Sequence, residues 1–422
     1  MNREERALAL DAQDELADFR EHFYLPPDTI YMDGNSLGLP SREAEAALLQ
    51  VLDEWKRLAI GGFLQGETPW ISLGERLGEL QAPLVGAHPD EVVATGSTTV
   101  NLHQLVATFY QPEGRRRKVL ADELNFPSDL YALQSQVRLH GLEPAQDLVL
   151  VRSRDGRTLQ EDDIVAAMTD EVAVVVLPSV LYRSGQLLDL ERLTAEAHAR
   201  GCLIGFDLCH SAGAVPHELS AWGVDFAYWC TYKYLNSGPG GIAGLYVNRR
   251  HHGRLPGLCG WWGYRSDARF AMRPEFEAAP TAAAWQIGTP TMLSAAPLLG
   301  SLALFAEAGM ERLRARSLAL TEYLMELVDT LPEDLGYRIG TPREPSRRGG
   351  HVAVEHPDAW RVCQALLARG VVPDFRPPDV VRLAPVALYT TYHEVWRAVR
   401  HLAAVVQEGD LEHFSAKRGL VS

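Results

Sequence analysis

Lysine is scarce in this 422-residue sequence. Only Lys56, Lys118, Lys233 and Lys417 occur among its 40 basic residues, so 36 of these are arginine. A Walker-type phosphate loop requires a glycine directly before its lysine, and none of the four lysines follows a glycine. That class of nucleotide site is therefore excluded. A codon bias towards arginine accounts for the general scarcity, but only lysine can lose its proton and form an imine.

Long hydrophobic runs, surplus positive charge and a cysteine framework are also missing. No apolar run approaches the ~20 residues that cross a bilayer, and the N-terminus lacks an apolar stretch of signal-peptide length. The net charge of −15 argues against nucleic acid and anionic membranes as partners. Five cysteines are an odd number in apolar surroundings, so we expect no disulfide framework. These absences predict a soluble, cytoplasmic protein.

The chain from about 90 to 250 alternates short apolar runs with helical periods. Strands are expected over 92–95, 118–121, 147–151, 172–177 and 202–206. Helices are expected between them, for example over 100–110 and from Pro127 onwards. Continuous apolar strands separated by helices predict an α/β fold, with a mainly parallel sheet covered by helices on both faces.

After about residue 292 the pattern changes. One long helical stretch is expected over 293–330, followed by a connection rich in Pro, Arg and Gly. A strand over 351–354, a helix over 359–369, strands near Val371 and Val381 and a helix from Tyr392 are expected next. We therefore predict a large α/β domain over 61–292 and a small C-terminal α+β domain over 293–422. The N-terminal segment, 1–60, is expected to pack with the small domain.

The first candidate for chemistry is the pair Asp207 and Lys233. Asp207 ends one apolar strand and Lys233 follows another, 225–230, so both are expected at the sheet edge where parallel sheets bind ligands. A buried carboxylate beside an imine-forming lysine suits pyridoxal phosphate. The carboxylate keeps the pyridine nitrogen protonated, and the lysine holds the aldehyde and moves protons. Taken alone, the spacing favours a strand-end cap and a solvated lysine.

Three further motifs support a cofactor site. Ser97-Thr98-Thr99 stands between a strand and a helix, where free N–H groups and hydroxyls bind phosphate, although a simple helix cap explains it equally well. Phe126-Pro127-Ser128-Asp129 follows the next strand, and Phe126 is suited to stacking on an aromatic ring. Gly238-Pro239-Gly240-Gly241 keeps backbone bulk away from a bound ring, but it lacks the spacing and acidic partner of a dinucleotide motif.

Two segments carry a specific family resemblance. Phe206-Asp207-Leu208-Cys209-His210-Ser211-Ala212-Gly213 and the stretch 222–236 resemble kynureninase, a family of aspartate-aminotransferase-like, fold-type I pyridoxal-phosphate enzymes. Further matching motifs lie at 34–38, 100–103, 126–129, 260–263 and 382–385, in order along nearly the whole chain. The resemblance implies hydrolytic cleavage of L-kynurenine to anthranilate and L-alanine. This step belongs to the kynurenine pathway of tryptophan catabolism, which also leads to NAD biosynthesis.

The resemblance implies a role for each matching residue. Lys233 would hold the cofactor aldehyde, Asp207 would pair with the pyridinium nitrogen near His210, and Tyr232 would bind the phosphate and assist proton transfer. The other cofactor-binding residues would be Thr98, Thr99, Phe126, Ser128, Asp129, Trp261 and Thr289. The substrate-binding residues would be Asn35, Ser36, Phe63, Trp262 and Arg382. Arg382 would bind the substrate α-carboxylate through its two-pronged guanidinium. Without the resemblance, a surface ion pair is its more ordinary interpretation.

The resemblance also implies substrate choice and assembly. Relatives that prefer 3-hydroxykynurenine are similar to one another in having His and Asn near the substrate ring, where this sequence has Phe63 and Thr289. A hydroxylated substrate needs hydrogen-bond partners and Phe63 offers none, so we expect unsubstituted kynurenine to be preferred. A homodimer with shared active sites is implied, in which Trp261 and Thr289 reach the neighbouring cofactor.

Different functions remain open from the residues alone. Gly34-Asn35-Ser36-Leu37-Gly38 matches the serine-hydrolase pattern G-x-S-x-G, but only ~30 residues precede it, whereas that turn normally follows several strands. No metal site is expected, because His251-His252 and Cys209-His210 lack ligand spacing. The residues also allow an aminotransferase, a cysteine desulfurase-like enzyme or a catalytically inactive protein of the same fold. The base that activates water is not identified, and Tyr232 is a candidate.

Overall fold

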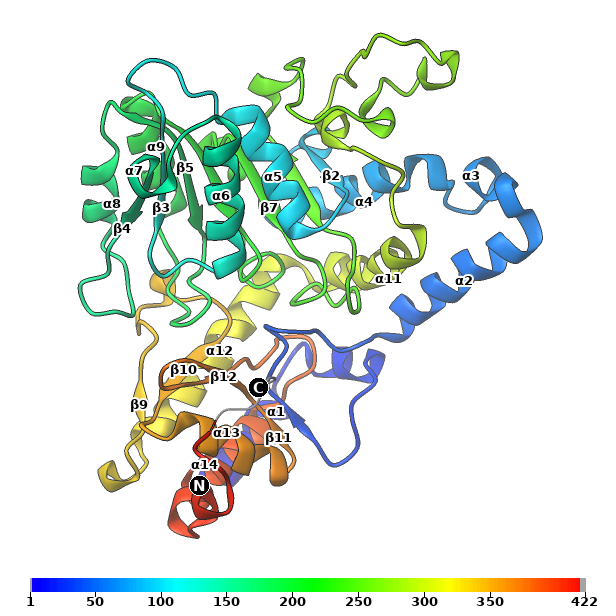
Figure 1. Cartoon of the computed structure of the whole chain (residues 1–422). Helices are drawn as coiled ribbons and strands as arrows, with labels where there is room; N and C mark the ends of the chain where they lie inside the picture. The colour runs from blue at the N-terminus through cyan, green and yellow to red at the C-terminus, as the bar shows by residue number, and fades with distance from the viewer. Residues whose placement is uncertain (1, 418–422) are drawn as a thin grey trace.

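The computed structural model describes residues 2–417 (Figure 1). Within this range the largest sheet has seven strands in the order β2-β8-β7-β6-β5-β3-β4. The strands are β2 (Val92–Ala94), β3 (Lys118–Asp122), β4 (Leu148–Val151), β5 (Val172–Pro178), β6 (Leu203–Asp207), β7 (Phe226–Trp229) and β8 (Gly244–Val247). Strands β3 to β7 run parallel, and β8 is antiparallel to β7 and β2. The predicted α/β class is confirmed.

Strand β8 escaped the sequence patterns for a local reason. It is short and begins with Gly244, directly after a glycine-rich loop. A Cβ at Gly244 would lie 2.1 Å from the ring of Trp229, which is fully buried on β7. A glycine inside a strand often marks such a close approach, although by composition it argues against a strand.

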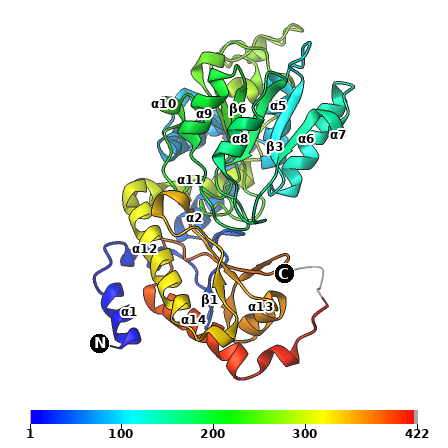
Figure 2. The same cartoon turned by 90° about the vertical axis from the view of Figure 1, so that its left-hand side faces the viewer.

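Helices cover both faces of the large sheet (Figures 1 and 2). Helices α5 (Thr98–Phe109) and α6 (Pro127–Leu139) share one hydrophobic core with the sheet. Helices α4 (Leu73–Gln81), α8 (Glu161–Ala167), α9 (Leu190–Ala199) and α11 (Met292–Ala308) contribute to the core on the other face. The remaining short helices of this part are α3 (Gly62–Gln65), α7 (Pro144–Asp147) and α10 (Leu219–Trp222). All residues of β5 are buried, as expected for a central strand covered on both faces.

The C-terminal part has a core of its own. Its four-stranded antiparallel sheet has the order β12-β13-β10-β9. The strands are β9 (Arg338–Ile339), β10 (Val352–Glu355), β12 (Asp374–Arg376) and β13 (Val380–Leu383), and the helices are α12 (Met310–Asp329), α13 (Ala359–Ala368) and α14 (Tyr392–Gln407). The sequence patterns did not reveal β9 or β12, which are only two and three residues long.

The start of the chain lies against this C-terminal part (Figure 2). Helix α1 (Arg3–Asp11) packs on α14, and β1 (Ile30–Tyr31) pairs in parallel with β11 (Val371–Val372). Helix α2 (Arg42–Leu58) then leaves it and packs along α11. The exact domain boundaries drawn from the sequence remain a prediction.

The helical stretch expected over 293–330 is two helices. The axes of α11 and α12 are bent by 84° at Gly309, whose φ of +76° is a backbone conformation that glycine adopts without steric cost. Among residues 2–417 no single helix is long and apolar enough to span a membrane, and α11 and α12 meet the length and composition test only as a bent pair.

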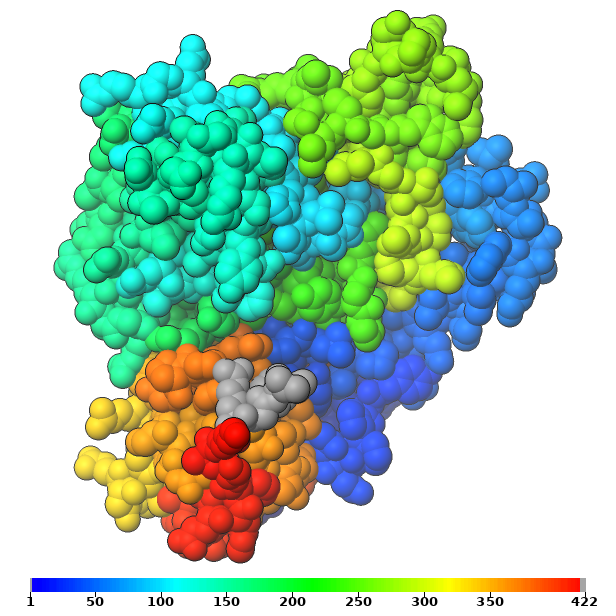
Figure 3. Space-filling view, viewed as in Figure 1, coloured from blue at the N-terminus to red at the C-terminus, as the bar shows by residue number. Residues whose placement is uncertain are grey.

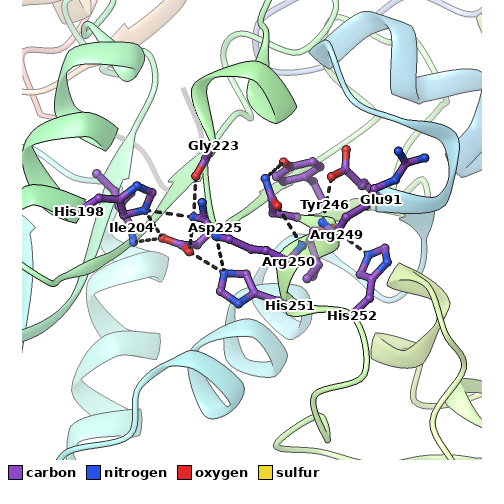
Figure 4. A network of polar contacts seen from close by, with 12 residues as sticks. Glu91, His198, Ile204, Gly223, Asp225, Tyr246, Arg249, Arg250, His251 and His252 are labelled. Carbon is purple, nitrogen blue, oxygen red and sulfur yellow. Dashed lines mark hydrogen bonds and ion pairs between the residues drawn. The ribbon is translucent and has the colours of Figure 1, made fainter.

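A buried carboxylate fixes the start of β7 (Figure 4), whereas Lys233 follows the other end of that strand. Asp225 is fully buried directly before the strand. The partners of its two carboxylate oxygens are His198, the backbone N–H of Ile204, Arg250 and His251. They come from α9, β6 and the segment after β8, so Asp225 links neighbouring elements where the strands begin.

Candidate active site

Predicted active-site residues gather where strands of the large sheet end. Asp207 is the last residue of β6, and Lys233 comes shortly after β7. The Nζ of Lys233 lies 3.0 Å from the Nε2 of His210, which belongs to the turn after β6. The structure thus brings an amine, an imidazole and a carboxyl group from adjacent strands to one edge of the sheet.

The carboxyl group of Asp207 is fixed by its surroundings. Its Oδ1 accepts the backbone N–H of Cys209 at 2.7 Å, and its backbone carbonyl accepts the hydroxyl of Ser179 at 2.9 Å. Burial raises the pKa of Asp207, while the hydrogen bond from Cys209 and the charge of Lys233 act in the opposite direction. A cationic N–H group placed against this carboxyl would favour its ionised form.

Two hydroxyl groups meet at the first turns of neighbouring helices. The Oγ1 of Thr99 and the Oγ of Ser128 are 2.7 Å apart. Thr98 and Thr99 open α5, and Pro127 and Ser128 open α6. The first turn of a helix has free backbone N–H groups and the positive end of the helix dipole. The pair is therefore suited to bind an anion such as phosphate.

The side chain of Asp129 is engaged elsewhere. Its carboxyl group accepts the hydroxyl of Tyr228 at 2.7 Å and is almost completely buried. Burial and the nearby Asp207 hold the pKa of Asp129 well above its usual range. A contribution of Asp129 to phosphate binding would therefore have to come from its backbone. Phe126, one residue before α6, meets Tyr182 edge-on at 5.4 Å and is 43% exposed.

Arg382 lies on β13 with its guanidinium fully buried between two parts of the chain. It pairs with the carboxylate of Asp374 on β12. Its Nη1 donates to the carbonyl of Tyr182 at 2.6 Å, and its Nη2 donates to the hydroxyl of Ser36 at 3.1 Å. Arg382 is not the surface ion pair of its ordinary interpretation, because the chain holds it inside, where it can orient a carboxylate.

The turn 34–38 brings Asn35 and Ser36 to the same region. A Cβ at Gly38 would lie 2.3 Å from the carbonyl oxygen of Lys233, and the N–H of Gly38 donates to the carbonyl of Tyr232. The glycine thus permits close packing against the lysine segment. Asn35 is fully buried, and neither polar atom of its amide has a partner among the described residues. Among the described residues Ser36 contacts the guanidinium of Arg382 and the carboxyl group of Asp33 but no histidine base, so this turn does not form a serine-hydrolase elbow.

These residues fit pyridoxal phosphate. Lys233 supplies an amine for the aldehyde, Asp207 a buried carboxyl for the ring nitrogen, and Thr99 with Ser128 an anion site at two helix ends. Each group demands a different chemical partner, and the cofactor combines an aldehyde, a pyridine and a phosphate.

Comparison with known proteins gives the same assignment. A family model described as the kynureninase C-terminal domain matches residues 313–402. Curated proteins named kynureninase from Geobacillus thermodenitrificans and Bacillus thuringiensis are 58% and 59% identical to this chain over 418 residues, which is 99% of this chain and 98% of each relative. The chain belongs to the kynureninase family. It is therefore an enzyme, a hydrolase acting on a carbon–carbon bond, and pyridoxal phosphate is its cofactor.

Solved structures of lower identity share the fold. A C-DES mutant with glycine covalently linked to its pyridoxal-phosphate cofactor superposes with a TM-score of 0.79 at 17% identity, over 91% of this chain and 98% of that one. The cysteine desulfurase of Thermococcus onnurineus gives a TM-score of 0.76 at 19% identity, over 94% and 98%. The predicted fold-type I architecture is confirmed.

Tyr232, next to Lys233 in the sequence, has a strongly perturbed hydroxyl group. It is partly buried beside the two thiols of Cys209 and Cys230. Burial raises the pKa of Tyr232 well above its ordinary value, and the neighbouring Cys230 adds to the effect. The phenol therefore keeps its proton near neutral pH and can donate a hydrogen bond.

Some of the residues that the family resemblance implies make no hydrogen bond or ring contact with Lys233 in the described part of the structure. Phe63 meets Trp70 at 5.5 Å and Trp262 at 6.2 Å. Trp261 is 47% exposed and donates to the carbonyl of Arg269, and Thr289 is exposed. Within residues 2–417, no hydrogen bond or ring contact of these side chains links them to Lys233. They form a second group, near α3 and the segment 260–290.

Several residues of the site gave no signal in the sequence. Asp374 and the carbonyl of Tyr182 hold Arg382, and Tyr228 holds Asp129. Asp33 lies near this cluster, where burial and the charge of Asp374 raise its pKa to about 6. Asp374 stands opposite Arg382 in the antiparallel pair β12–β13, but the sequence patterns did not reveal β12.

Proposed function

We propose that this chain cleaves L-kynurenine to anthranilate and L-alanine, as a cytoplasmic step of tryptophan catabolism, and that it prefers the unsubstituted substrate. The observation that carries the proposal is the contact of the Lys233 Nζ with the Nε2 of the buried His210 at 3.0 Å, together with the nearby charge of Arg382, which also acts to lower the pKa of His210. An amine-exchanging lysine and a carboxylate-binding arginine together select an α-amino acid.

The chain's own groups divide the work as follows. When bound, pyridoxal phosphate supplies an electron sink for the substrate α-carbon. Lys233 would hold the cofactor aldehyde, and its amine would move the α-proton of the substrate. Asp207 keeps the pyridine nitrogen protonated, and Thr99 with Ser128 binds the phosphate.

Two further groups orient the substrate and supply a proton. Arg382 binds the α-carboxylate, and Asp374 fixes its guanidinium in one plane. Cleavage adds water to the substrate ketone, breaks the Cβ–Cγ bond and leaves a carbon that must be protonated to give alanine. Tyr232 keeps its proton near neutral pH, so it acts as a donor and not as the base that activates water.

The central test is the release of fluorescent anthranilate from L-kynurenine. The cofactor-loaded protein should turn over, and Lys233→Ala should lose activity by on the order of 10³-fold, because a positioned proton-transfer group is removed. Lys118→Ala is the matched control, since Lys118 pairs with Glu171 at the start of β3 and should be dispensable for turnover. Turnover that persists in Lys233→Ala would overturn the assignment. Alanine formation from cysteine without anthranilate release would support a desulfurase-like activity instead.

The substrate preference is supported by the aromatic surroundings of Phe63. Its ring neighbours are Trp70 and Trp262, and Phe63 itself offers no partner for a hydroxyl group. Comparing kcat/KM for kynurenine and 3-hydroxykynurenine tests the preference. Phe63→His should move the ratio towards the hydroxylated substrate by about tenfold, the value of one hydrogen bond. Phe63→Leu adds no donor and should leave the ratio unchanged. A native preference for 3-hydroxykynurenine would refute the proposal.

We also propose that the chain forms a homodimer with shared sites. The segment 255–290 and helix α3 project from the upper part of the molecule in Figure 3. Large apolar side chains are exposed there and in the turn before α3, namely Ile60, Leu64, Leu255, Phe270 and Met272. Association with a second copy would bury them.

Subunit mixing tests the shared site. In mixed dimers of Lys233→Ala with Trp261→Ala, one site receives both defects and the other receives none if Trp261 serves the neighbouring subunit. Activity should then recover on mixing. If each site keeps its own Trp261, mixing restores nothing and the shared site is refuted. Analytical ultracentrifugation of the unmixed protein checks the dimer itself.

A further inference from the structure

His351 is a buried histidine beside the active site that the roles above do not use. It stands directly before β10 and is fully buried. Neither ring nitrogen makes a hydrogen bond of normal geometry among the described residues, although the backbone of Tyr182 lies close enough to act on the pKa of the ring. Its ring meets the ring of His210 at a centroid distance of 5.5 Å and an angle of 61°. Leaving buried polar atoms without partners is costly, so this arrangement calls for a reason.

The backbone around His351 is firmly held. Arg314 donates to three carbonyl groups of the segment 345–349. The N–H of Gly349 donates to the carbonyl of Gly185 at 2.8 Å. A Cβ at Gly185 would lie 2.8 Å from the carbonyl oxygen of His351 and 3.3 Å from its Nε2, so the loop that carries this glycine packs directly on the histidine. The ring is therefore fixed by chain segments on two sides.

The two imidazoles lie among three cations. Burial holds the pKa of His351 well below its usual range, and the charges of Arg382, Lys233 and Arg376 act in the same direction. The pKa of His210 is also held well below its usual range by burial and then by the same cations. Both rings are uncharged at neutral pH, so each has one N–H donor and one acceptor nitrogen.

The contact with Lys233 decides which nitrogen of His210 carries the proton. When Lys233 is an ammonium it has donors only, so the Nε2 of His210, 3.0 Å away, is then the acceptor. The proton then sits on the Nδ1 of His210, which is buried and has no partner among the described residues. The neighbouring ring of His351 has an acceptor nitrogen to offer.

We propose that His351 is a positioning residue whose uncharged ring accepts the Nδ1–H of His210 through one water, and thereby keeps the Nε2 of His210 an acceptor directed at Lys233. The inference rests on the role proposed above for Lys233. An acceptor held at this place stabilises a proton on the lysine nitrogen, both in the free amine and when that nitrogen holds the cofactor.

The test uses the cofactor-loaded enzyme and two substitutions. His351→Leu removes both ring nitrogens, and His351→Gln keeps an uncharged donor and acceptor. In His351→Leu the pH midpoint of the bound cofactor's visible absorbance should fall by about 0.5–1 unit, and kcat for L-kynurenine should fall about five- to tenfold, as expected for one lost hydrogen bond. His351→Gln should keep the native midpoint and stay within about twofold of the native kcat. If His351→Leu does not fold, His351→Met takes its place, because it also lacks an acceptor nitrogen.

A matched control separates positioning from general packing. His356 is a buried histidine directly after β10, and its Nδ1 accepts the N–H of Asp358 at 3.0 Å. His356→Leu should leave the absorbance midpoint unchanged. A native midpoint and native kcat in folded His351→Leu would overturn the inference, and so would an equal midpoint shift in His356→Leu. Should the native enzyme release no anthranilate, the proposed function fails, whereas the absorbance midpoint still tests His351.

Discussion

Replacing Asp225 by asparagine should destabilise the fold without touching the chemistry. Both oxygens of this fully buried carboxylate are engaged, with His251 at 2.6 Å, the N–H of Ile204 at 2.8 Å and His198 at 2.9 Å. Asparagine keeps one acceptor and turns the other oxygen into an N–H₂ group that faces donors. Breaking a buried charged pair costs about 3–5 kcal/mol. Because Arg250 and His198 are partly exposed and can be hydrated, we expect about 2–4 kcal/mol.

The pH dependence of this contribution has a definite sign. Burial alone would raise the pKa of Asp225, but the hydrogen bonds from His198 and His251 and the charge of Arg250 outweigh burial, so the pKa is lowered from 3.8. When folding lowers the pKa of a carboxyl group, its full contribution to stability is present at pH values above its pKa in the unfolded chain. That contribution is lost as the pH falls towards its pKa in the folded protein. The penalty of Asp225→Asn should therefore be at full size at neutral pH.

The assays are denaturant unfolding and a thermal scan of the cofactor-loaded enzyme at pH 7. The kcat is measured on the same preparation. For a chain of this length, a loss of about 3 kcal/mol corresponds to a midpoint lower by roughly 3 °C in a thermal scan. The kcat per bound cofactor should be unchanged, since Asp225 and Lys233 lie at opposite ends of β7. Asp163→Asn is the control, because within residues 2–417 this partly exposed carboxylate pairs with the exposed Arg154 and no other cation. Unchanged stability in Asp225→Asn, or a loss of kcat at unchanged stability, would refute the reasoning.

Three more results follow from the site. Arg382→Lys should raise KM for L-kynurenine about 100-fold and lower kcat less, because an ammonium cannot bind a carboxylate with two parallel hydrogen bonds. Steady-state kinetics measure both constants, and an effect on kcat alone would contradict this prediction. Ser128→Ala should weaken cofactor binding about five- to 30-fold, measured by equilibrium dialysis, and a native affinity would remove Ser128 from the phosphate site. Burial and Asp374 raise the pKa of Asp33 from 3.8 to about 6, so its contribution to stability is lost as the pH rises between these values. Asp33→Asn should therefore raise the free energy of unfolding by up to about 3 kcal/mol over the native enzyme at pH 7 and by little at pH 4. Denaturant unfolding at the two pH values measures the difference, and an equal increase at both would count against this account.

The large sheet could be read from the sequence because its strands are continuous apolar runs. Such runs are required where helices cover both faces, and each was separated from the next by a helical period. Strand β8 and the bend at Gly309 could not be read in this way. The first depends on a glycine fitting against Trp229, and the second on a single backbone conformation inside an otherwise helical pattern.

The residues of the candidate site also fall into those that the sequence indicates and those that it does not. Residues at or shortly after the ends of strands, such as Asp207 and Ser128, could be found because the end of a parallel strand is a predictable place. The groups that orient them come from distant segments and carry no periodic signal. Tyr182 contributes only a backbone carbonyl to Arg382, and His351 meets His210 across 140 residues of chain. Their roles depend on proximity that only the folded chain creates.

The scarcity of lysine has a structural counterpart in the way buried arginines are used. Arg348 is fully buried and reaches the carbonyls of two other segments and the carboxylate of Glu322. Arg382 likewise connects three segments through one guanidinium. A planar group with five donors and a permanent charge suits such links, and it never yields a neutral amine. Lys233 has the opposite requirement, because its nitrogen must lose a proton to bond to carbon. Codon bias can replace lysine by arginine where a cation only needs to be held, but not at Lys233, where the reaction needs the neutral amine.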